Sequence, residues 1–97
     1  MIISFADDST EDVFNGINSK KARKCLDPKL FPIARRKLDM IDVAINLTDL
    51  RIPPSNHLEL LKGSLKEKYS IRINDQYRVV FRWTIQGAEE VQILDYH

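Results

Sequence analysis

Residues 69–83, which read YSIRINDQYRVVFRW, decide the fold of this chain. Apolar and polar side chains alternate on both sides of a central Asn-Asp-Gln, so two β-strands joined by a tight turn are expected. A turn of those three residues pairs Ile71 with Val79 and Arg72 with Arg78. One face of this hairpin is then wholly apolar, and the other face carries two arginines side by side.

Arg72 and Arg78 face each other in this register. Like charges opposed across a sheet destabilise it unless an anion lies between them, which indicates a phosphate site. After a second turn at Gln86-Gly87, residues 91–94 form the last expected strand, and its antiparallel return brings the end of the chain beside Tyr77 and Arg78. The predicted cluster at this end of the sheet consists of Arg72, Arg78, Asp95, Tyr96 and His97.

The first half of the chain is predicted to supply one strand and two helices. Residues 2–5 are a short apolar run that indicates the first strand. A brief helix is expected from about residue 8 to residue 14, with acidic residues in its first turn. Between residue 30 and about residue 47, apolar side chains recur at steps of three and four, which is typical of an amphipathic helix that starts near Pro28 or Pro32.

Two further segments complete the predicted architecture. Residues 20–24 are polar and fit either a loop or a further helix, and residues 50–56 contain two adjacent prolines that favour an extended connection. Neither the composition nor the spacing indicates a repeat or a second domain. We therefore expect one α+β domain over residues 1–97, with an N-terminal strand, two helices and an antiparallel sheet, about four strands in all.

The composition is that of an ordinary globular protein, with 43% hydrophobic and 30% charged residues. The apolar runs are too short to span a bilayer, and the N-terminus has no basic leader with a long apolar stretch, so we expect a cytoplasmic protein without membrane contact. Cys25 is the only cysteine, which excludes an internal disulfide and favours a half-buried thiol. The two histidines, His57 and His97, are too far apart in sequence to suggest a zinc site, and no metal or cofactor is expected.

Basic residues gather in two blocks although the formal net charge is only +1. Residues 20–37 carry eight basic side chains and one acidic one, and residues 62–82 carry six basic and two acidic ones. A local positive surface of this kind suits a polyanion such as RNA, and the plainer interpretation is a solvated helix face. The candidate RNA contacts are Lys20, Lys21, Arg23, Lys24, Arg35, Arg36, Arg51, His57 and Arg72.

The predicted cluster contains the groups that RNA cleavage without a metal requires: a base for the 2′-hydroxyl, an acid for the departing 5′-oxygen, and cations for the phosphorane charge. A histidine titrates near neutrality, so His97 suits the acid or the base, and Asp95 suits the base or orients a partner. Arg78 suits bidentate phosphate binding, with Lys62 as a second cation, and Tyr96 suits base stacking or proton donation. Each residue also has a plain structural interpretation, such as an ion pair between Arg78 and Asp95.

Several motifs resemble, in the same order, those of the HigB-type killer toxins of the RelE/ParE superfamily. They are residues 50–56 (LRIPPSN), residues 58–63 (LELLKG), the hairpin of residues 69–83 and the ending at residues 93–97 (ILDYH). The resemblance implies a RelE-like fold and a toxin that cleaves messenger RNA in the ribosomal A site and arrests translation. It also implies a HigA-like helix-turn-helix antitoxin as partner, with operator DNA bound only through that antitoxin.

The resemblance also implies site residues. By matching position it assigns catalytic roles to Arg78, Lys62, Asp95, Tyr96 and His97. One departure concerns Glu59, because some relatives have a catalytic histidine at this position, and His57 stands two residues away. The identity of the general base is therefore left open.

Two other functions are compatible with the same fold. One is a ParE-like protein that inhibits DNA gyrase by binding it without catalysis, and the other is a weakened toxin that acts mainly as an antitoxin-binding autoregulator. The ending at residues 95–97 together with Arg78 favours RNA cleavage, because a gyrase binder needs no titratable group there. The departure at Glu59 leaves the weakened toxin open.

Overall fold

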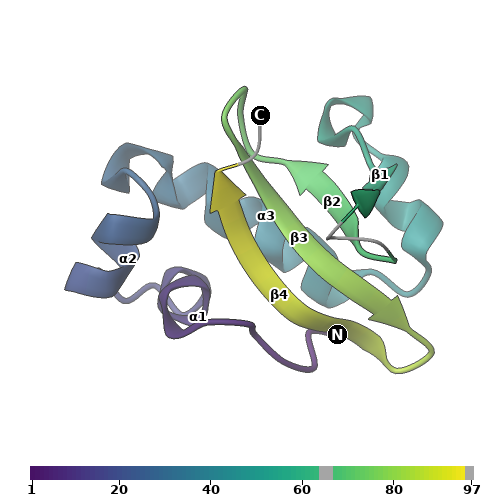
Figure 1. Ribbon diagram of the computed structural model, residues 1–97, viewed down its shortest axis with the longest axis horizontal. Helices are drawn as coiled ribbons and strands as arrows, with labels where there is room; N and C mark the ends of the chain where they lie inside the picture. Colours follow the sequence, from purple (N-terminus) through teal and green to yellow (C-terminus); the bar gives the residue numbers. More distant parts are fainter. Residues whose placement is uncertain (64–66, 96–97) are drawn as a thin grey trace.

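Helices cover one face of a four-stranded antiparallel sheet in the computed structural model, which describes residues 1–63 and 67–95 (Figure 1). Within these ranges, three α-helices and three short 3-10 helices precede the strands. In chain order the elements are α1 (Asp8–Phe14), α2 (Lys20–Cys25), η1 (Pro28–Leu30), α3 (Phe31–Val43), η2 (Leu47–Arg51), η3 (Pro54–Asn56), β1 (Glu59–Leu60), β2 (Tyr69–Arg72), β3 (Tyr77–Thr84) and β4 (Gly87–Asp95). The expected α+β class is confirmed.

The strands lie in the order β1-β2-β3-β4, each antiparallel to its neighbours. In the hairpin of β2 and β3, Ile71 faces Val79 and Arg72 faces Arg78, so the predicted register is confirmed. This register holds because a shift by one residue would turn every apolar side chain of the strand away from the core.

The ladder of β3 and β4 places the end of the described chain. Tyr77 lies opposite Asp95, as the antiparallel return predicts. Between these residues and the β3–β4 turn, β4 carries one extra residue relative to β3, and Glu90 in this region has a φ of 54°. This β-bulge bends β4 and changes which side chains share a face beyond it.

The hydrophobic core lies between α3 and the sheet face that α3 covers. The stripe of α3 that is fully buried there consists of Ala34, Leu38 and Ile41. Phe81 on β3 is also fully buried, and the centre of its ring lies 6.4 Å from the ring centres of both Tyr69 and Trp83. These aromatic contacts extend the core toward β1 and β2.

The N-terminal segment and α1 cover the outer edge of β4. The segment makes two isolated parallel bridges with β4 rather than the regular strand expected over residues 2–5. At the bulge, the N–H of Glu90 donates to Ser4 Oγ at 2.9 Å instead of to a backbone carbonyl, and this interrupts the ladder. Further along, Thr10 Oγ1 on α1 accepts from the N–H of Ile93 at 3.0 Å.

The polar segment of residues 20–24 lies in a helix, which is one of the two structures it was expected to fit. Ser19 Oγ accepts from the N–H of Ala22 at 3.1 Å and caps α2. The part of the chain that the structure describes therefore has three α-helices where two were expected. α1 contacts α2, α3 and β4, and it joins these elements at the end of the sheet opposite β1 (Figure 1).

α3 ends earlier than its apolar spacing predicts, at Val43. Asp49 Oδ2 accepts from two consecutive N–H groups just after α3, both at 3.0 Å, and these bonds start η2. The segment of residues 50–56 also turns where an extended connection was expected. Pro54 is tolerated there because it occupies the first position of η3, where no N–H donor is needed.

The longest helix of the described residues, α3, has 13 residues. No helix in these ranges combines the length and the apolar character that crossing a membrane requires. The same ranges contain no group of three or more His, Cys, Asp or Glu residues arranged to hold a metal ion.

Candidate functional site

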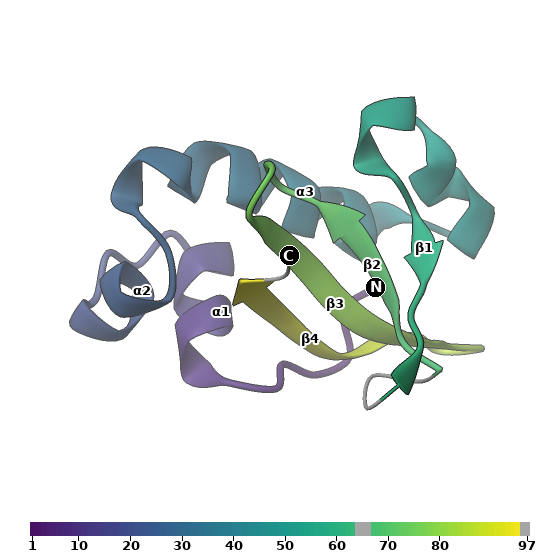
Figure 2. The same ribbon diagram turned by 45° about the horizontal axis from the view of Figure 1, so that its top comes forward.

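The sheet face turned away from α3, called here the outer face, carries Arg78 on the inner strand β3. Successive side chains of a strand point to opposite faces, so Arg78 shares the outer face with Ser70 and Val80, which pair with each other across β2 and β3. Glu59 joins them because β1 pairs it with Ser70. Figure 2 shows α3 behind the sheet, with β1 at the opposite end of the sheet from α1 and α2.

The Arg78 residue is held in a buried position, with only 9% of its surface exposed. Its Nε donates to Ser70 Oγ at 2.7 Å, and its Nη2 donates to the backbone carbonyl of His57 at 2.5 Å. A carboxylate oxygen of Glu59 lies 3.8 Å from the same Nη2. Both hydrogen bonds are to neutral acceptors and orient the guanidinium, whereas the half-exposed carboxylate of Glu59 offsets part of its positive charge.

Arg72 lies opposite Arg78 but has a partner of its own. Its Nη2 pairs with Asp75 Oδ1 in the turn of the same hairpin. The repulsion between two opposed arginines is therefore relieved within the chain. The pairing by itself does not require a phosphate between the two side chains, contrary to the sequence interpretation.

The structure places Asp95 and Arg78 on opposite faces of the sheet. Asp95 pairs with Tyr77, which packs against the core, whereas Arg78 pairs with Leu94. Asp95 Oδ2 accepts from Gln76 Nε2 at 2.9 Å. The sequence predicts a shared site of Arg78 and Asp95, and this prediction is wrong. Side chains alternate between the two faces along β3 and β4, so the two residues point to opposite sides of the sheet.

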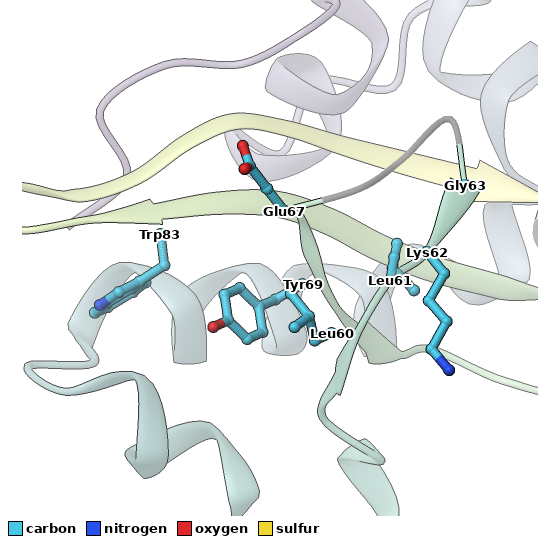
Figure 3. A pocket seen from close by; sticks show the side chains of 7 residues that line it. All are labelled: Leu60, Leu61, Lys62, Gly63, Glu67, Tyr69 and Trp83. Atoms are coloured by element: carbon cyan, nitrogen blue, oxygen red, sulfur yellow. The ribbon is translucent and has the colours of Figure 1, made fainter.

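The other residues with expected catalytic roles do not join Arg78 in the described chain. Tyr96 and His97 lie outside the described residues. Lys62 is exposed and lines a largely apolar pocket of about 610 Å³. Its other lining residues are Leu60, Leu61, Gly63, Glu67, Tyr69 and Trp83 (Figure 3). Arg78 is not among the described residues that line this pocket.

The expected RNA-contacting residues fall into separate groups. Arg51 and His57 line a pocket of about 440 Å³ formed by η2, η3 and the edge of the sheet. The basic residues on α2 and on the first half of α3 are exposed, namely Lys20, Lys21, Lys24, Arg23, Arg35 and Arg36. Lys21 Nζ lies 3.2 Å from Asp8 Oδ2, which partly neutralises this surface. Among the described residues, these basic side chains on α2 and α3 therefore belong to a different surface group from the pocket of Arg51 and His57.

Lys37 is buried, which a count of charged residues along the sequence does not reveal. Lys37 belongs to the basic block by charge, yet only 6% of its surface is exposed. Its Nζ donates to Asn56 Oδ1 at 2.5 Å. Burial, and secondarily the charge of Arg36, lower the pKa of Lys37. The signal for its burial is its spacing of three from Ala34, which puts Lys37 on the apolar stripe of α3.

Ser70 is the other contact that sequence reasoning missed. It is fully buried, and its hydroxyl accepts from Arg78 across the strands. A serine in an alternating strand gives no signal of such a role, because strands with one polar face contain serine for many reasons. Only the pairing of β2 with β3 shows which side chain its hydroxyl meets.

Known proteins resemble this chain over most of its length. A family model described as a RelE-like toxin of the type II toxin-antitoxin system HigB matches residues 3–97. The chain is 48% identical over 62 residues to Toxin HigB-1 of Vibrio cholerae serotype O1, which covers 64% of each protein. It is 50% identical over 54 residues to an uncharacterized protein of Haemophilus influenzae, which covers 56% of this chain and 54% of that protein. The matched parts thus span between about half and two thirds of these relatives.

A solved structure has the same fold. One chain of the YoeB-YefM complex from Staphylococcus aureus superposes with a TM-score of 0.61, covering 100% of this chain and 95% of that chain. The sequence identity is 23%, so this likeness concerns the fold alone. The family match over residues 3–97 goes further than the fold. The chain belongs to the HigB-like family of RelE-like toxins of type II toxin–antitoxin systems.

Proposed function

We propose that this chain is the toxin of a toxin–antitoxin pair and acts as an endoribonuclease that cleaves messenger RNA on the ribosome, halting translation. The observation that carries the proposal is the guanidinium of Arg78, which is buried and oriented by Ser70 and His57 on the face opposite α3. A cation fixed before the reaction stabilises charge that develops in the transition state without reorganising. Phosphodiester cleavage through a phosphorane develops such charge.

Each step of the proposed reaction has a candidate group. The RNA 2′-oxygen attacks the adjacent phosphorus, the 5′-oxygen of the next nucleotide leaves, and a 2′,3′-cyclic phosphate forms. Arg78 binds the non-bridging oxygens of the phosphorane. Glu59, whose side chain is 55% exposed and lies 3.8 Å from Arg78, is placed to accept the proton of the 2′-hydroxyl. His97, which the sequence predicts to be the acid or the base, is the proposed proton donor for the leaving oxygen.

Three further residues have proposed auxiliary roles. Tyr96 stacks on a base, and Lys62 supplies a second cation for the RNA backbone; the chemistry of the two side chains and the family resemblance both support these roles. Asp95 acts as a positioning residue, because its side chain accepts from Gln76 on the face opposite Arg78. The proposed reaction uses no metal ion and no cofactor.

An antitoxin is part of the same proposal. The family is one of type II toxin–antitoxin systems, and the structural relative was solved as a complex of two proteins. We propose a HigA-like helix-turn-helix protein as the partner, with operator DNA bound through it. The ribosome and messenger RNA are the proposed targets, and the cytoplasm is the proposed compartment.

The test is to map messenger RNA 5′ ends in a translating extract with and without the purified protein, and on the same transcript without ribosomes. New ends in register with the reading frame, formed only during translation, are the expected result. Arg78→Lys is expected to lower the cleavage rate about 100- to 1000-fold, because lysine keeps the positive charge and lacks the two parallel N–H donors of the guanidinium. Arg82→Lys is the matched control, since Arg82 lies on the same strand and its Nε is already 3.1 Å from Glu90.

Other outcomes identify other functions. An absence of new ends, together with loss of gyrase supercoiling, would establish the ParE-like alternative. Antitoxin binding without either effect would establish the weakened toxin. Equal cleavage by Arg78→Lys and the wild type would remove Arg78 from the mechanism.

A further inference from the structure

The structure contains a polar pair where a helical stripe is otherwise apolar. Lys37 on α3 and Asn56 at the end of η3 are both buried, with exposed fractions of 6% and 0%. Desolvating an ammonium group is costly, and burial lowers the pKa of Lys37 accordingly. Apolar side chains would fill the same space without that cost, so the position calls for an explanation other than packing.

Asn56 uses both ends of its amide to tie the preceding loop to α3. Its Oδ1 accepts from Lys37 Nζ at 2.5 Å, and its Nδ2 donates to the carbonyl of Leu50 at 3.1 Å. The same Nδ2 is 3.5 Å from the carbonyl of Ile52. These bonds close the turn that runs from η2 through η3 and fix Asn56 relative to the helix.

The next residue carries the contact to Arg78. His57 follows η3 and has a left-handed backbone, with φ 46° and ψ 56°, which is uncommon for a residue with a Cβ and typical of a helix end. In this conformation its carbonyl accepts from Arg78 Nη2 at 2.5 Å. Asn56 immediately precedes His57, so the bonds that hold Asn56 also restrict where the carbonyl of His57 can lie.

We propose that Lys37 and Asn56 are positioning residues, which hold the carbonyl of His57 in place and through it orient the guanidinium of Arg78. The functional consequence rests on the proposed role of Arg78 in RNA cleavage. The proposal also gives a physical reason for the motif of residues 50–56: its prolines shape the turn, and its final asparagine locks the turn to α3. Neither Lys37 nor Asn56 touches the RNA in this account.

The test uses a double variant, Lys37→Met with Asn56→Leu, which replaces the buried polar pair by apolar side chains of similar size. Such replacements often leave stability unchanged or raise it, so folding and activity can separate. We expect a melting temperature close to that of the wild type. We expect kcat for RNA cleavage to fall by roughly 10- to 100-fold, because a small misplacement of a catalytic group costs that much, with KM within about twofold of the wild type.

A matched control and a conservative variant accompany it. Ile41→Val removes one methylene from the same stripe of α3 and is expected to keep kcat, because it leaves the polar pair in place. Lys37→Arg keeps a donor for Asn56 and is expected to retain more of kcat than Lys37→Met. If the double variant does not fold, this comparison of two single variants decides the proposal; equal kcat for both overturns it.

A spectroscopic measurement separates this proposal from the proposed function. Rotation about the Nε–Cζ bond of Arg78, followed by 15N NMR, is expected to be slow in the wild type and faster in the double variant. A wild type that cleaves no RNA would refute the proposed function and leave this readout to decide the positioning role. Unchanged Arg78 rotation, or unchanged kcat in a folded double variant, would overturn the proposal.

Discussion

Replacing Thr10 by valine should remove the hydrogen bond that joins α1 to the C-terminal part of β4. Thr10 is fully buried, and its Oγ1 accepts from the N–H of Ile93 at 3.0 Å. Valine keeps the shape of the side chain and removes the acceptor, so it leaves a buried N–H without a partner. That loss costs about 1–3 kcal/mol of unfolding free energy. For a domain of this size, the melting temperature should fall by roughly 4–8 °C for each kcal/mol.

Thr10→Ser is the matched control, because it keeps the hydroxyl and loses only a methyl group, at a cost of about 0.8 kcal/mol or somewhat more. The two variants are compared by urea unfolding and by amide hydrogen exchange. The Ile93 amide should exchange faster in Thr10→Val than in Thr10→Ser at matched global stability. The Val91 amide, which donates to the carbonyl of Ser4, should serve as an internal reference. Protection of Ile93 in Thr10→Val equal to that of the wild type would refute the reasoning.

Four further outcomes follow from the packing and the titration of three residues. Phe81→Ala should lower the unfolding free energy by about 3–5 kcal/mol in urea titration, because Phe81 is fully buried in the core. Gly87→Ala should lower the melting temperature, because Gly87 has a φ of 141° and a Cβ there would meet the carbonyl of Met1. Burial and, secondarily, Asp7 raise the pKa of Cys25 from 9.0 to about 11, so at pH 8 native Cys25 should react with iodoacetamide about 100-fold more slowly than in urea. The thiol of Cys25 ionises at a lower pH in the unfolded chain than in the folded one. Its contribution to the unfolding free energy should therefore be fully present below pH 9 and lost as the pH rises toward 11, and melting curves recorded across that range would show the loss.

The β2–β3 hairpin was predictable because its two signals are local and agree. The alternation of apolar residues and the three-residue turn both require Ile71 opposite Val79, and the structure has that pairing. The ends of the helices were less predictable. α3 stops at Val43 because the side chain of Asp49, six residues later, binds N–H groups that follow the helix. Apolar spacing contains no information about such a bond.

The candidate site also combines features that the sequence predicts with features that it does not. Arg78 could be singled out from the sequence, because its strand and its place near the turn follow from the hairpin. The sheet face on which Asp95 lies could not be predicted from the sequence, because it depends on the length of the β3–β4 turn and on the extra residue near Glu90. A change of one residue reverses the face of every side chain beyond it. The predicted position of Asp95 beside Tyr77 at this end of the sheet is confirmed, whereas a shared site with Arg78 is wrong because the two side chains lie on opposite faces.

The amino-acid sequence by itself determined the α+β class and the register of the hairpin, because these depend on short-range periodicity and turn chemistry, and it singled out Arg78 as a candidate site residue. The tertiary structure alone decided which groups hold that guanidinium. Ser70 on β2 and the carbonyl of His57 accept from Arg78, and the buried pair of Lys37 and Asn56 joins α3 to the turn before His57; these contacts form only when the sheet packs on the helix. Hydrogen bonds between segments distant in sequence depend on distances and angles of the folded chain, and no local pattern of residues encodes those.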